Sequence, residues 1–273
     1  MGLISWGVLK MNILKGMNRR TFLLNSVSFL CSSLIGLDGI SRAFGFTENK
    51  EKQNPLIAII IDDIGFSRSQ ARRFLDLGVP ITFAILPKLE KSRELAEEIH
   101  VKGHETMLHQ PMEPHNSRLN PGPGALFVGY GAERIAEVVK ENIAGIPYAV
   151  GVNNHMGSRL TECQVEINDV LNVIENNSLF FVDSFTSIHS VAYREASKRH
   201  MPSTFRNIFL DNLRNEAYIL AQLYKLEQHA CKYGSAVGIG HPFPETAKAI
   251  SRYLAGPQNP SDYLAHISTV LYA

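Results

Sequence analysis

The stretch Ile61-Asp62-Asp63-Ile64-Gly65 follows an apolar run, Leu56-Ile57-Ala58-Ile59-Ile60. The run has strand length, is rich in isoleucine and shows no helical stripe. It therefore predicts a strand buried on both faces, as in parallel sheets that are covered by helices. Two neighbouring carboxylates end this strand, and a buried charge is costly unless it is paired. We expect a cation beside them; the alternative is a helix-capping aspartate next to a solvated one.

The composition fits one large soluble domain. Of the 273 residues, 45% are apolar and 19% are charged, which is ordinary for a globular protein. The 27 basic and 26 acidic residues leave a formal net charge of +1, and no basic block interrupts the body of the chain. Nucleic acid is therefore not an expected partner.

The N-terminus has the pattern of an export signal. Arg19 and Arg20 precede an uncharged apolar stretch that runs to Leu37, and small residues follow at Ser41 and Ala43. This order predicts a twin-arginine-like signal peptide over 1–43, a polar linker over 44–54 and a folded domain over 55–273. We expect a periplasmic or extracellular protein with only transient membrane contact through that signal. A retained anchor is the alternative, although the stretch is short for a span.

Cleavage after Ala43 leaves two cysteines, Cys163 and Cys231. Two distant cysteines make neither a zinc framework nor a disulfide scaffold. An oxidised pair between them stays open at this stage.

Apolar strand segments alternate with amphipathic helical segments along the body of the chain. This alternation predicts a parallel sheet, open or closed into a barrel. The long stretch Pro114–Gly131 is rich in proline and glycine and predicts a functional loop. The seven expected strands are Leu56–Ile61, Ile81–Leu86, Glu105–Leu108, Tyr148–Val152, Leu179–Val182, Thr204–Leu210 and Ala236–Ile239. The expected helices are Ser67–Leu77, Ser92–Lys102, Ala132–Ala144, Glu162–Asn176, Val191–Arg199 and Asn212–Tyr233.

Six of these seven strands end in aspartate or histidine. In α/β folds the carboxyl ends of the strands are where active sites are built. Carboxylate and imidazole together suit a divalent metal such as zinc. The residues are Asp62, Asp63, His109, His155, Asp183, Asp211 and His241.

Two motifs resemble those of the polysaccharide deacetylase superfamily of metal-dependent carbohydrate esterases. They are the Asp-Asp pair in Ile61–Gly65 and Gly103-His104-Glu105 with His109 four residues beyond the glutamate. Glu113 stands where the superfamily has a second histidine. This departure and the motifs around the later strand ends resemble the divergent polysaccharide deacetylase branch. The resemblance implies a distorted (β/α) barrel of about seven parallel strands, with its active site at the C-terminal strand ends.

The resemblance also implies a metal site. Asp63 and His109 match metal ligands of the superfamily, and the metal is expected to be zinc. Two residues compete for the third ligand position. Glu113 is the aligned one, whereas His155 lies at another strand end and is chemically the better zinc donor. We expect His155, with Glu113 in a supporting role.

The catalytic roles are implied in the same way. Asp62 matches the general base and His241 the general acid, and Asp183 is the expected orienting partner of His241. The implied activity is metal-dependent removal of N- or O-acetyl groups from a glycan, hydrolysis of amide (C–N) bonds included, in carbohydrate metabolism. Glycan is the expected substrate, and no protein partner is indicated.

One other function stays open. The same groove could serve a non-catalytic or weakly active envelope protein that binds a glycan or a protein. Glu113 and the lack of an Arg-Pro-Pro-Tyr motif favour this alternative. The intact Asp62, Asp63, His109 and His241 favour the enzyme, because a binding module needs no base opposite an acid.

Overall fold

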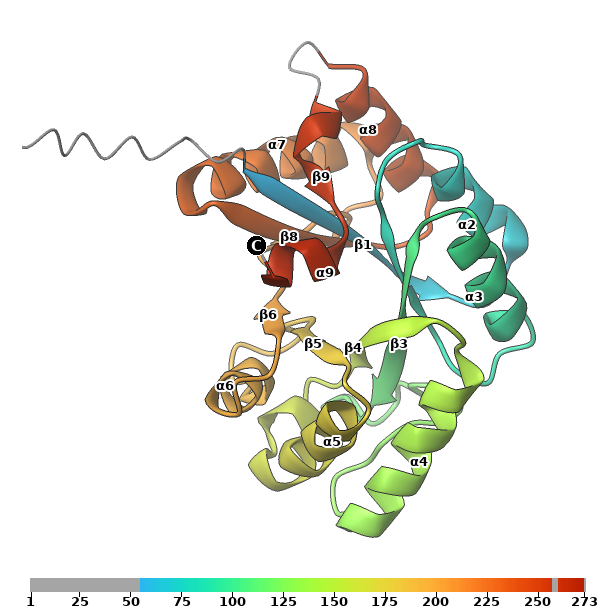
Figure 1. The fold of residues 1–273 in the computed structure, drawn as a ribbon, viewed down its shortest axis with the longest axis vertical. Helices are drawn as coiled ribbons and strands as arrows, with labels where there is room; N and C mark the ends of the chain where they lie inside the picture. The colour runs from blue at the N-terminus through green and yellow to red at the C-terminus, as the bar shows by residue number, and fades with distance from the viewer. Residues whose placement is uncertain (1–54, 257–259, 273) are drawn as a thin grey trace, which may run out of the picture. The chain divides into compact units, whose positions relative to one another are not determined.

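The computed structural model describes residues 55–256 and 260–272. The expected signal peptide and linker therefore lie outside the described residues. A parallel sheet dominates the described part, with the strand order β6-β5-β4-β3-β2-β1-β8-β7 and β9 paired to β1 (Figure 1). The strands are β1 (Leu56–Ile64), β2 (Thr82–Ile85), β3 (Glu105–Met112), β4 (Ala149–Met156), β5 (Phe180–Asp183), β6 (Ser203–Phe205), β7 (Ile208–Phe209), β8 (Ser235–Gly240) and β9 (Leu264–Ala265).

Helices connect most successive strands and pack on the outer face of the curved sheet, whereas α9 packs on its inner face (Figure 1). All six helices that the sequence predicts are present. Two further helices, α8 and α9, escaped prediction. The helices are α2 (Arg68–Leu75), α3 (Ser92–Val101), α4 (Ala132–Gly145), α5 (Gln164–Asn176), α6 (Ala192–Lys198), α7 (Glu216–Tyr233), α8 (Pro244–Leu254) and α9 (Ile267–Tyr272). None of the helices in this part of the chain is long and apolar enough to cross a membrane.

The predicted (β/α) barrel-like fold is confirmed, but the sheet order runs through eight strands rather than seven. The expected strand Thr204–Leu210 divides into β6, which pairs with β5, and β7, which pairs with β8. These two strands are the opposite ends of the sheet order, and only Arg206 and Asn207 lie between them in sequence. The sheet therefore curves until its edges are neighbours, and no ladder between β6 and β7 is found in the described residues.

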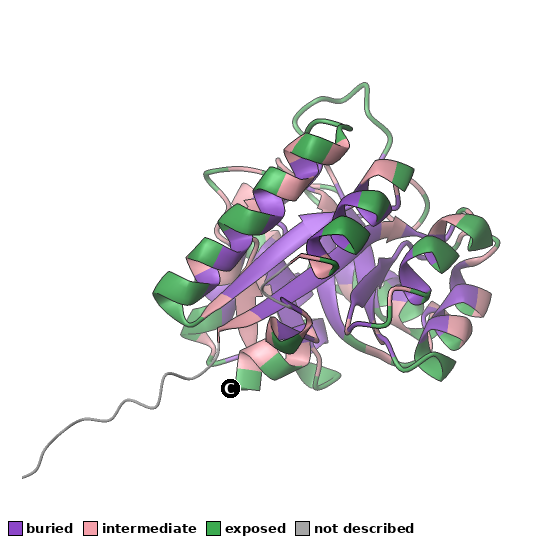
Figure 2. Cartoon of the chain, turned by 90° about the horizontal axis from the view of Figure 1, so that it is seen from above, coloured by how far each residue is buried: buried purple, intermediate pink, exposed green. Residues whose placement is uncertain are grey.

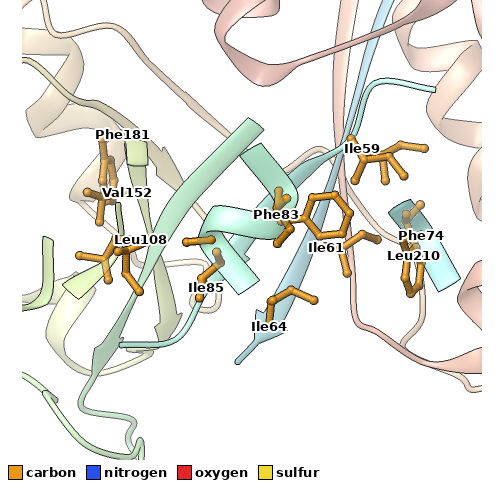
Figure 3. Packing of buried hydrophobic residues seen from close by; sticks show 14 of the residues in the cluster. Ile59, Ile61, Ile64, Phe74, Phe83, Ile85, Leu108, Val152, Phe181 and Leu210 are labelled. Carbon is orange, nitrogen blue, oxygen red and sulfur yellow. The ribbon is translucent and has the colours of Figure 1, made fainter. Parts of the chain in front are cut away.

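The alternation of side chains along β1 divides the core into two parts. Ile57, Ile59 and Ile61 belong to the large outer cluster between the sheet and the helices, part of which Figure 3 shows. Ala58 and Ile60 belong to a smaller cluster on the inner face, together with Ile267 of α9. Figure 2 shows the resulting pattern, with buried strands and with helices exposed on their outer sides. Both faces of β1 are buried, so its polar residues are confined to the strand end.

Candidate functional site

The end of β1 departs from regular strand geometry and so presents both aspartates at the sheet edge. Asp63 has φ of 57° and Gly65 has φ of 137°, and the pairing of β1 with β2 shifts between Ile61 and Ile64. A bulge of this kind re-aims side chains that a regular strand would send to opposite faces. Glycine is required at 65, since a Cβ there would lie 3.0 Å from Leu89 Cδ1 and from Ser92 Oγ.

Three donor atoms meet beside this bulge. Asp63 Oδ1 lies 2.9 Å from His155 Nδ1 and 3.2 Å from His109 Nε2, and the two histidine nitrogens are 3.1 Å apart. It is the one group of three or more potential metal-ligating side chains found in the described residues. In a tetrahedral zinc site, donor atoms lie about 3.3 Å from one another. Asp63 Oδ1 is buried and has no hydrogen-bond partner of acceptable geometry. The donor types, their spacing and this unsatisfied oxygen fit a divalent metal.

Asn153 holds two members of the site through one amide. Its Oδ1 accepts a hydrogen bond from His109 Nδ1 at 2.7 Å, and its Nδ2 donates to Asp62 Oδ1 at 2.8 Å. Asn153 is fully buried, so water does not compete for either hydrogen bond. Because His109 carries its proton on Nδ1, the Nε2 lone pair is available to a metal. Sequence reasoning missed this role, although Asn153 lies two residues before His155 and a strand places such residues on one face.

The two aspartates have opposite protonation tendencies. Burial raises the pKa of Asp62, and this effect exceeds the opposing influence of His109, of His241 and of the Asn153 hydrogen bond. Burial also acts to raise the pKa of Asp63, but His109 and His155 outweigh it and hold that pKa well below its usual range. Asp63 is therefore the anionic group of the cluster. Asp62 is the carboxylate that accepts a proton more readily.

His241 approaches the same cluster from the end of β8. Its Nε2 lies 3.8 Å from Asp63 Oδ2, while its Nδ1 donates to Asp211 Oδ1 at 2.9 Å. Asp211 Oδ2 also accepts from the backbone N–H of His241 and from Thr246 Oγ1. Burial acts to lower the pKa of His241, but the hydrogen bond and charge of Asp211, with Asp62 and Asp63, raise it to about 9. His241 is therefore an imidazolium at neutral pH.

The carboxylate that orients His241 differs from the one that we expected. Asp211 at the end of β7 makes that contact, whereas Asp183 accepts hydrogen bonds from Phe185 N, Ser190 Oγ and Tyr193 N. The physical reason is sheet order: β7 is the neighbour of β8, and β5 is not. Asp183 organises the loop between β5 and α6 instead.

Glu113 lies outside the metal-ligand cluster. Its Oε1 accepts from Arg159 Nη1 at 2.6 Å and its Oε2 from Val128 N at 2.7 Å. Glu113 thus anchors the end of the long loop 114–131. The oxidised pair that the sequence leaves open does not form: Cys163 and Cys231 are both free thiols.

Comparisons with known proteins give a consistent assignment. A sequence profile described as "Divergent polysaccharide deacetylase" matches residues 59–271. The chain is 33% identical over 196 residues to the uncharacterized protein YibQ of Escherichia coli, a match that covers 72% of this chain and 61% of YibQ. It thus spans about three fifths of that relative's length. An uncharacterized protein of Haemophilus influenzae is 31% identical over 204 residues, with 75% of this chain and 70% of that protein covered. A crystal structure of an uncharacterized protein from Agrobacterium tumefaciens superposes with a TM-score of 0.73 at 25% identity, covering 80% of this chain and 89% of that one.

Proposed function

Because the chain belongs to the divergent polysaccharide deacetylase family, we propose that it is a metal-dependent hydrolase that removes acetyl groups from a glycan. The observation that carries this proposal is the convergence of three potential ligands, one free carboxylate and one imidazolium at the same sheet edge. A structural cluster needs no such division between a basic and an acidic group. A hydrolase does.

Asp63, His109 and His155 would hold the metal, and zinc suits one carboxylate with two imidazoles. A divalent cation there supplies a water of lowered pKa and polarises the acyl oxygen. Asn153 fixes His109 in the tautomer that ligation requires.

Asp62 is the proposed general base. It is not one of the three donors, and its raised pKa favours proton uptake. Asp62 accepts a proton from the water that attacks the acyl carbon, and Asn153 Nδ2 keeps its carboxylate in place. His241 then donates its Nε2 proton to the leaving nitrogen as the C–N bond breaks, because an amine leaves poorly unless it is protonated. Asp211 stabilises the imidazolium and sets its orientation.

The direct test is acetate release from a panel of N-acetylated glycans by zinc-loaded protein. Asp62→Asn should retain the metal and lose turnover, because it removes proton acceptance and leaves the donor atoms intact. Release from no member of the panel by metal-loaded wild-type protein contradicts the proposal. The non-catalytic alternative loses support from Glu113, since His155 already completes a three-donor set without it.

We also propose that the protein acts outside the cytoplasm, where glycan polymers are found. The support is the order of Arg19-Arg20, apolar stretch and small residues over 1–43. Arg19→Lys with Arg20→Lys should leave unprocessed precursor inside the cell, as fractionation and immunoblotting would show. Unchanged processing argues against the twin-arginine route.

A further inference from the structure

A cavity lies where the two ends of the sheet meet, and we call it the edge cavity. It has a volume of about 530 Å³, within the range of small-ligand sites. Its lining includes Arg206 and Asn207, the two residues that join β6 to β7. The complete lining consists of Phe185, Phe205, Arg206, Asn207, His229 and Tyr233.

Arg206 brings a positive charge to this cavity, and the charges of Asp62 and Asp183 act on it without forming an ion pair with it. Its Nε donates to Ser184 O at 2.7 Å and its Nη2 to Phe185 O at 2.8 Å. In the described part of the chain it forms no ion pair, and its Nη1 has no hydrogen-bond partner. The lining contains no acidic residue. Because no carboxylate contacts the guanidinium, its free Nη1 can donate a charge-assisted hydrogen bond to an anion from outside the chain.

Two aromatic rings form one wall, and the backbone holds one of them in a costly conformation. Phe185 has φ of 51°, where a bulky side chain is strained. Its N–H donates to Asp183 Oδ1 at 2.8 Å while its carbonyl accepts from Arg206, so both sides of the residue are held. The Phe185 ring lies 5.9 Å from the Phe205 ring. Aromatic faces are the surfaces on which the C–H faces of sugar rings pack.

Two other lining residues, His229 and Asn207, supply polar atoms. His229 Nδ1 is buried and has no partner in the described residues. Asn207 Oδ1 accepts from Val237 N at 2.7 Å, which leaves its Nδ2 without a partner there. Aromatic surface combined with a few unused hydrogen-bonding groups is the lining that a hydroxylated ring requires.

The edge cavity is close to the proposed acid. The Arg206 guanidinium lies 4.9 Å from the centre of the Phe209 ring, and that ring lies 5.3 Å from the His241 ring. One aromatic side chain therefore separates the cavity's charged group from His241. A polymer with one residue at the metal cluster could reach the cavity with a nearby residue.

We propose that the edge cavity binds a negatively charged sugar residue of the glycan, with its anionic group on Arg206 and its ring against Phe185 and Phe205. This proposal rests on the proposed function for the identity of the polymer as a glycan. It adds that the preferred glycan is acidic. The charge can come from a carboxylate or from a phosphate.

The test compares two probes that share N-acetylglucosamine and differ in charge. Binding of hyaluronan tetrasaccharide, which carries carboxylates, and of neutral chitotetraose to zinc-loaded protein is measured by calorimetry. We expect the acidic probe to bind about tenfold more tightly, as a charge-assisted hydrogen bond implies. Its advantage should shrink with rising salt, while the neutral probe responds little. Equal affinities, or binding of neither probe, overturn the proposal without recourse to any variant.

Variants test whether the preference for the acidic probe depends on the residues that line the edge cavity. Arg206→Gln should abolish the preference for the acidic probe, and Phe205→Ala should weaken both probes. Arg73→Gln, which changes an exposed arginine of α2 that forms no ion pair in the described residues, should change neither affinity. Because Arg206 also holds the Phe185 carbonyl, thermal stability and zinc content are checked for each variant. A preference that survives in folded Arg206→Gln overturns the proposal. Displacement of the acidic probe by glucuronate or by glucose 6-phosphate, and not by glucose, assigns the anionic group; displacement by neither overturns the proposal.

The test of the edge cavity can fail or succeed independently of the test of the proposed hydrolase activity. Charge-dependent binding without acetate release from either probe contradicts the proposed hydrolase and leaves the edge cavity supported. Acetate release with equal affinities supports the hydrolase and removes the edge cavity's role.

Discussion

Asn153 offers the sharpest test of the site, because one buried amide serves two different groups. Asn153→Leu removes the acceptor of the His109 Nδ1 proton and the donor to Asp62 at once. Loss of an outer contact to a ligating histidine reduces metal affinity by about 10- to 100-fold. Loss of the hydrogen bond to a buried carboxylate costs about 1.5–3 kcal/mol. The leucine variant should therefore lose both metal affinity and activity.

Asn153→Asp separates the two effects. One aspartate oxygen can still accept the hydrogen bond from His109, so zinc affinity should stay within about threefold of wild type. That change is smaller than the loss of metal affinity expected when the contact to His109 is removed. The other oxygen would replace the amide nitrogen that lies 2.8 Å from Asp62 Oδ1. Two carboxylates at that distance cannot both be ionised, so the pair shares one proton and Asp62 is the free carboxylate for only part of the time. Acetate release should fall by about 100-fold, the lower end of the range for a general base.

The assays are zinc titration against a competing chelator and acetate release at saturating zinc. Asn142→Ala is the matched control: Asn142 is equally buried and its Nδ2 donates two hydrogen bonds, to Gln110 Oε1 and Gly124 O. It should lower the melting temperature and leave zinc affinity unchanged. If Asn153→Leu binds zinc as wild type does, or if Asn153→Asp binds it as weakly as Asn153→Leu, the dual role of Asn153 is wrong.

Other predictions concern individual members of the site. His155→Ala should reduce zinc content measured by elemental analysis, while Glu113→Ala should keep it and lower thermal stability; the reverse pattern would exchange their roles. In metal-free protein the His241 ring should titrate at about 9, as NMR would show, and Asp211→Asn should bring that pKa down toward 6.5. Because the folded pKa is raised, the stabilisation by the His241–Asp211 pair is complete below about pH 6.5 and is lost as the pH rises through 9. Turnover should fall below the raised pKa of Asp62 and above that of His241, and Asp62→Asn should abolish the rate at every pH.

The sequence predicts the fold well where the physical signal is local. Runs such as Leu56–Ile60 need cover on both faces, and only a helix-covered parallel sheet provides it. The segment Thr204–Leu210 predicts one strand, because its apolar residues flank Arg206 and Asn207 without a glycine or proline. In the structure these two polar residues join two edge strands instead.

The sequence predicts which side chains lie at the strand ends, but it does not predict which of them meet. Chain order places Asp63, His109 and His155 at one sheet edge, and the structure brings them together. Which carboxylate meets His241 depends on sheet order, and β7 lies beside β8 through a crossover that no local pattern reveals. Asp183 and Asp211 look alike in sequence for this reason.

Backbone strain shows what the loops around the site are built to do. Asp63 and Phe185 both have positive φ at strand ends, a conformation that costs of order 1–3 kcal/mol for residues with large side chains. Each is held by contacts that serve neighbouring groups: the ligand histidines for Asp63, and Asp183 with Arg206 for Phe185. Glycine would avoid this strain at either position, but it would supply neither the carboxylate nor the ring. At Asp63 the strained backbone presents a carboxylate to the metal cluster. At Phe185 it presents a ring to the edge cavity, as the proposed contact with a sugar ring requires.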